Sequence, residues 1–65
     1  MKINKFKAPN PQWDITDFTC DKTGISIQKH TMNIEPYYTV FKIKENGKYY
    51  DIMEDVFEII KKLIV

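Results

Sequence analysis

The chain has 65 residues, of which 43% are hydrophobic and 29% charged, and its ten lysines and nine acidic residues leave a formal charge of +1. A chain of this length forms one small core and has little room for a deep substrate cleft, since ligand pockets usually occupy about 300–1,000 Å³. The composition argues against a disordered tail, an acidic mimic of nucleic acid and a strongly basic tail. We expect a single domain spanning residues 1–65.

The cysteine content and the hydropathy pattern indicate a cytoplasmic protein. Cys20 is the only cysteine, whereas small secreted domains usually depend on several disulfides. The N-terminal lysines precede no apolar stretch of signal-peptide length, and no apolar run approaches the roughly 20 residues of a membrane helix. Ten isoleucines and the absence of arginine are typical of an AT-rich genome, as in a low-GC bacterium, its phages or its mobile elements. A viral origin would place the protein in the host cytoplasm.

Residues 1–12 are predicted to be extended or only partly ordered. Pro9 and Pro11 lack backbone donors, which favours a lead-in or an edge segment over a central strand. An alternative is that Asn10 caps a short helix that has Pro11 in its first turn and runs through Asp17.

Residues 13–20 and 25–34 are predicted to be two antiparallel strands. Between them, Asp21 to Gly24 has the residue order of a turn closed by a glycine of positive φ. The apolar residues of the second run change phase along its length. A bulge or break near Lys29 and His30 is therefore expected, because strand side chains alternate with a period of two.

The segment from Tyr37 to Met53 is predicted to be a tight hairpin. Asn46-Gly47 is the preferred pair for a two-residue type I′ turn. This turn fixes the cross-strand partners, which either have opposite charges or are both apolar. The expected pairs are Glu45 with Lys48, Lys42 with Asp51, Ile43 with Tyr50, and Phe41 with Ile52.

A helix is predicted over residues 55–64. Asp55 can cap it, Glu58 completes a capping box, and the lysines of the last turn suit the helix dipole. We expect it to pack on the hairpin, which gives an α+β fold with a four-stranded antiparallel meander and one C-terminal helix on one face (ββββα). The predicted core consists of Phe41, Ile43, Tyr50, Ile52, Val56, Ile59, Ile60 and Leu63.

No catalytic, cofactor or metal site is predicted, so we expect a protein that is not an enzyme. Cys20 and His30 are the only thiol and imidazole, and the expected register separates them along the ladder, whereas a nucleophile pair needs contact. Asp14, Asp17 and Asp21 would share a face only in a helix. Zinc and calcium sites need more ligands than the chain offers in a suitable pattern.

The outer face of the hairpin is the predicted partner-binding surface. One short helix cannot cover both sheet faces, and an exposed aromatic and methionine patch on a small domain usually marks an interface. Its expected contact residues are Tyr38, Val40, Lys42, Lys44, Tyr49 and Met53, with Asp51 among them.

The favoured function is binding to another protein, as a regulator or inhibitor of phage or mobile-element type. A second interpretation is a single-stranded nucleic-acid-binding domain that uses the same tyrosines and lysines. A third is a homodimer that pairs through exposed sheet edges. A further alternative leaves no interface, because the proline-containing N-terminus folds back over this face.

Overall fold

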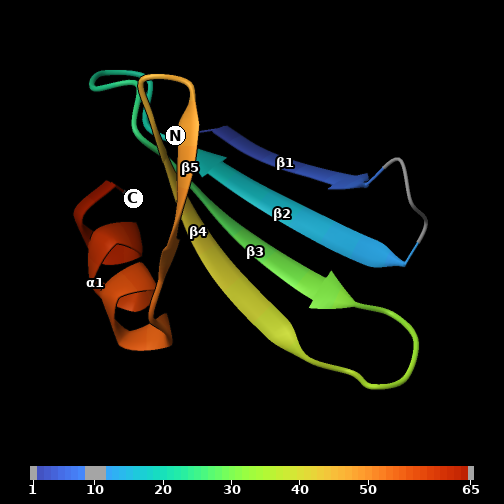
Figure 1. Ribbon diagram of the computed structural model, residues 1–65. Helices are drawn as coiled ribbons and strands as arrows, with labels where there is room; N and C mark the ends of the chain where they lie inside the picture. Colours follow the sequence, from blue (N-terminus) through green and yellow to red (C-terminus); the bar gives the residue numbers. More distant parts are fainter. Residues whose placement is uncertain (1, 9–11, 65) are drawn as a thin grey trace.

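The structure is a computed structural model that describes residues 2–8 and 12–64 (Figure 1). Five strands precede one helix. The elements are β1 (Lys2–Lys7), β2 (Trp13–Thr19), β3 (Ser26–Met32), β4 (Thr39–Glu45), β5 (Lys48–Ile52) and α1 (Glu54–Ile64).

The strands form one antiparallel meander in the order β1-β2-β3-β4-β5. The α+β class is therefore confirmed, but the prediction of four strands is wrong. The additional strand is the N-terminal segment, which pairs with β2 through Ile3 opposite Phe18 and Phe6 opposite Ile15. Ile3 and Phe6 lie on opposite faces of β1, so the segment lacks the alternation that marks a strand with one buried face.

The remaining N-terminal alternatives have different outcomes. The expected edge segment is confirmed, because β1 occupies one edge of the sheet. The alternative helix through Asp17 is wrong, since Trp13–Thr19 is a strand. Its proposed start at Asn10 and Pro11 lies outside the described residues.

Both predicted turns are confirmed. Asn46 and Gly47 have φ values of 51° and 78°, and the pairing of β4 with β5 has the predicted register. Gly24 has a φ of 74°, and its N–H donates to the Cys20 carbonyl over 2.8 Å. Positive φ at these glycines is the conformation that their lack of a Cβ permits.

The predicted bulge in the second strand is wrong. β3 pairs without interruption with β2 and with β4. The change of phase needs no bulge, because the sheet has apolar residues on both faces. Ile27 points to the helix side with Phe18 and Ile43 opposite it, whereas Met32 lies on the other side opposite Trp13.

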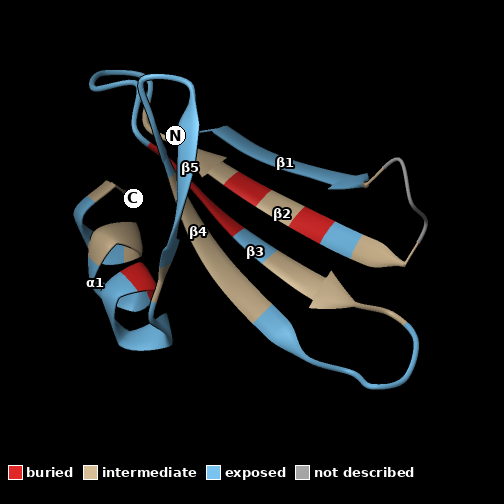
Figure 2. Ribbon diagram, viewed as in Figure 1, coloured by how far each residue is buried: buried red, intermediate tan, exposed pale blue. Residues whose placement is uncertain are grey.

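The core on the helix side is built around Phe57. Its side chain is 1% exposed, and Ile27 on the sheet is 0% exposed. The Phe57 ring lies 5.9 Å from the ring of Phe18 and 4.7 Å from that of Phe41, measured between centroids. Figure 2 shows buried residues in β2, in β3 and on one turn of α1.

The helix is rotated relative to its predicted orientation. It begins at Glu54, and Asp55 lies in its first turn, where one carboxylate oxygen accepts the Val56 N–H over 2.9 Å. The predicted core is wrong for four residues, which remain 38–79% exposed: Tyr50, Val56, Ile59 and Leu63. The other four are partly buried: Phe41, Ile43, Ile52 and Ile60. Packing of the Phe57 ring turns the Val56, Ile59 and Leu63 side of α1 away from the sheet.

We expect Phe57→Ala to lower the free energy of unfolding by about 3–5 kcal/mol, because it removes the most buried ring of the core. Leu63→Ala, at a position that is 79% exposed, is the matched control and should change it by less than about 0.5 kcal/mol. Urea unfolding at low protein concentration, followed by Trp13 fluorescence, measures both. A larger loss for the Leu63 variant would contradict this packing.

Candidate functional site

The sheet face opposite α1 is not covered by any described segment of the chain. Residues directly opposite in an antiparallel pair point to the same side, so the register assigns side chains to each face. We call this side the open face. It bears Phe6, Trp13, Ile15, Gln28, His30, Val40, Lys42, Lys44, Tyr49 and Asp51.

An open pocket of about 300 Å³ lies on this face. Every strand contributes to its lining: β1 and β2 supply an aromatic and an aliphatic side chain, β3 supplies an amide and an imidazole, and β4 and β5 supply an amine and a phenol. The lining residues are Phe6, Ile15, Gln28, His30, Lys42 and Tyr49. Curvature of the twisted sheet (Figure 1) lets side chains from all five strands converge there.

A series of hydrogen-bonded polar groups on the open face reaches the pocket at Gln28. Asp17 is 9% exposed and Gln28 is 6% exposed. The Gln28 amide nitrogen donates to one Asp17 carboxylate oxygen over 3.1 Å, and Thr19 donates to the other over 2.7 Å. The Ser26 hydroxyl extends this hydrogen-bonded series and lies 2.9 Å from the Thr19 hydroxyl. The buried carboxylate is thus held by two hydrogen bonds, which offset the cost of its desolvation.

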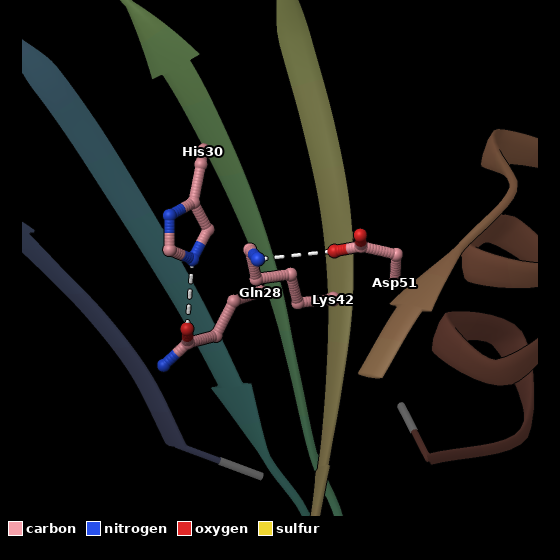
Figure 3. Close-up of polar contacts among 4 residues, drawn as sticks. All are labelled: Gln28, His30, Lys42 and Asp51. Carbon is pink, nitrogen blue, oxygen red and sulfur yellow. Dashed lines mark hydrogen bonds and ion pairs between the residues drawn. The ribbon is translucent and has the colours of Figure 1, made fainter. Parts of the chain in front are cut away.

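These hydrogen bonds orient His30. With the Gln28 amide nitrogen bound to Asp17, the amide oxygen faces His30 Nε2 at 2.8 Å (Figure 3). An amide oxygen only accepts, so His30 Nε2 carries the proton and Nδ1 is the acceptor of the neutral ring. The Asp17 carboxylate therefore fixes the tautomer of a residue in the pocket through one intervening amide.

Burial lowers the pKa of His30 below its ordinary value of 6.5, and the nearby Lys42 ammonium lowers it further, while Asp51 opposes the shift. The neutral form of the imidazole therefore predominates at pH 7. Lys42 Nζ lies 3.0 Å from an Asp51 carboxylate oxygen in an exposed ion pair (Figure 3). Such pairs contribute little to stability, but this one restrains the Lys42 ammonium at the pocket rim.

Aromatic contacts extend the face beyond the pocket. The Trp13 ring lies edge-on to Tyr38 at 5.4 Å and to His30 at 6.4 Å. Lys44 Nζ lies 5.6 Å from the centroid of the Tyr49 ring. These contacts give the open face a fixed aromatic surface from β2 to β5.

The structure places the six predicted contact residues on or beside this face. Val40, Lys42, Lys44 and Tyr49 belong to it by register. Tyr38 meets Trp13, as above. Met53 follows β5 and lies at the edge of the sheet, in a pocket lined by residues of both faces, among them Val40 and Asp51 on the open face and Phe41 and Ile52 on the helix side.

Sequence reasoning missed the other half of the pocket. Phe6, Ile15, Gln28 and His30 come from strands that were not aligned with the hairpin. The alternation of Trp13 and Ile15 was the available signal: pairing the two hairpins would have placed both side chains on the same face as Val40, with Ile15 opposite His30 and His30 opposite Val40. The predicted fold-back of the N-terminus is wrong for residues 2–8, because β1 extends the sheet at its edge.

Cys20 and His30 lie apart, as predicted: His30 pairs with Ile15 of β2, five positions before Cys20, which follows that strand. Within residues 2–8 and 12–64, no three His, Cys, Asp or Glu side chains gather into a group able to hold a metal ion. Across the same ranges, no helix has the length and apolar character that crossing a bilayer requires.

Comparison with protein-family models, with curated proteins and with solved structures gave no match.

The pKa of His30 gives a pH dependence of stability. The folded protein binds the His30 proton more weakly than the unfolded chain, so the contribution of His30 to stability is present above pH 6.5 and is lost as the pH falls below that value. A His30→Gln variant should lose less stability between pH 7 and about 5.5. An NMR titration of the His30 ring should give a midpoint below 6.5, and a midpoint at or above it would contradict the burial of the imidazole.

Proposed function

We propose that the chain is a small non-enzymatic binding protein that acts by occupying a surface of another protein, as a regulator or inhibitor does. The observation that carries the proposal is the uncovered open face, where half-exposed aromatic side chains lie in and beside a pocket whose lining includes the hydrogen-bonded Gln28 and His30. Phe6, Tyr38 and Tyr49 are 46–49% exposed, and Met53 is 70% exposed. Aromatic and methionine side chains in such a cluster are enriched in the cores of protein interfaces.

The pocket suits one anchoring side chain of a partner. Its apolar walls, Phe6, Ile15 and Tyr49, would contact the body of that side chain. The neutral His30 ring offers an acceptor at Nδ1, for which no described residue is a partner. The best match is a side chain with an apolar body and a polar donor, such as tyrosine or tryptophan. Lys42 and Lys44 would lie at the rim and contribute orientation more than affinity.

The distribution of cations favours a protein over single-stranded nucleic acid. On the open face, Lys42 is paired with Asp51 and Lys44 lies near the Tyr49 ring. Three other lysines, Lys5, Lys29 and Lys61, line a separate pocket on the helix side. A strand-binding groove needs several cations free to meet phosphates along its aromatic path, and of the two lysines named on the open face one is already paired with Asp51.

Affinity capture from a host-like lysate, with and without nuclease and at low and moderate salt, tests this proposal. We expect a protein partner that resists nuclease and moderate salt, because an apolar interface is only weakly screened. Tyr49→Ala should abolish its capture. Tyr50→Ala is a matched control, because Tyr50 is 50% exposed against 49% for Tyr49 and lies on the opposite face of the same strand.

Two results would overturn the proposal. Retention of oligonucleotides alone, with loss as salt increases, would indicate phosphate binding by counterion release. Equal loss of the captured protein in the Tyr49 and Tyr50 variants, both folded by circular dichroism, would show that the open face is not the contact surface.

A further inference from the structure

The outer side of α1 bears an apolar stripe that the fold does not use. Val56, Ile59 and Leu63 are 38%, 59% and 79% exposed. Their spacing of three and four residues places them on one side of the helix. Phe57, Ile60 and Ile64 follow the same spacing on the neighbouring side, where Phe57 packs on the sheet. The helix therefore has two adjacent apolar sides, and only one is covered by described residues.

Charge along α1 is arranged in two halves. Glu54 and Asp55 lie in the first turn, and Lys61 and Lys62 lie in the last. Lys62 comes seven positions after Asp55, which is about two helical turns, so both lie along the same outer edge of the stripe. An identical helix laid antiparallel would bring the acidic end of each copy to the basic end of the other.

We propose that the chain forms a two-fold symmetric dimer in which the α1 helices of two copies pack antiparallel through this stripe. Val56 of each copy faces Leu63 of the second copy, and the two Ile59 side chains meet near the axis. Asp55 of each copy lies near Lys62 of the second copy. A two-fold interface brings the same surface of both copies together, so that surface must complement itself. Antiparallel helices place opposite charges side by side, whereas parallel helices would place like charges together.

The proposed interface is small. One helix from each copy buries less than the roughly 1,200–2,000 Å² of a standard stable interface. The dimer is therefore weak, and its population depends on concentration. It is independent of the proposed function, because α1 and the open face lie on opposite sides of the sheet.

Sedimentation equilibrium from about 10 μM to about 1 mM tests the dimer, and this range covers weak association. The average mass should increase toward twice that of the chain. Leu63→Glu should weaken association at least about tenfold while the fold persists, since this side chain is 79% exposed. Tyr37→Glu, at a position that is 69% exposed in the segment between β3 and β4, is the matched control and should leave the dimer unchanged.

Charge reversal tests the antiparallel order. Asp55→Lys and Lys62→Glu should each weaken the dimer, and the double variant should restore it, because the reversed charges again face each other. Circular dichroism confirms that each variant keeps its helix. A chain that stays monomeric at about 1 mM overturns the proposal. A dimer that tolerates Leu63→Glu also overturns it and indicates pairing through a sheet edge instead.

Discussion

Packing of the Phe57 ring between Phe18 and Phe41 holds α1 on the sheet, and most other features depend on it. An 11-residue helix would not be stable alone in water. Once this ring sets the rotation of α1, the same contact decides which apolar side of the helix is buried and which remains outside. It also commits α1 to one face, so the other face has no helix to cover it.

The open face is ordered by other means. Curvature of the sheet and the side chains of neighbouring strands bury Ile15, Asp17 and Gln28 without an opposing layer. The polar groups satisfy one another: among the described residues, no buried side-chain nitrogen or oxygen lacks a hydrogen-bond partner. Such a connected network is costly to disturb, because loss of one member leaves the others unsatisfied. The network therefore holds the Gln28 amide and the His30 ring, which line the pocket, in defined orientations.

The sequence predicted what local chemistry determines. Asn46-Gly47 fixes the turn and thus the register of β4 with β5, which the structure confirms. The rotation of α1 was not predictable in the same way, because Val56, Phe57, Ile59, Ile60, Leu63 and Ile64 form two overlapping apolar sides. Choosing between them requires the position of the Phe57 ring against strands that are distant in sequence.

The pocket was predictable only in part for a related reason. Its hairpin side follows from the alternation of Lys42, Lys44 and Tyr49. Its other side depends on the placement of β1, for which the segment gives a weak signal, since Ile3 and Phe6 lie on opposite faces. Long-range pairing of such a strand is specified by its neighbour β2, not by its own pattern.

All six residues of β1 are exposed, and in the sheet order the strand has β2 as its one neighbour. Local unfolding begins where buried contacts are fewest, so β1 should separate from the sheet at a lower free energy than the central strands. Phe6 leaves the pocket wall whenever this occurs. The free energy of ligand binding is therefore reduced by the cost of keeping β1 paired with β2. In return, a ligand that contacts Phe6 should slow hydrogen exchange along the whole of β1.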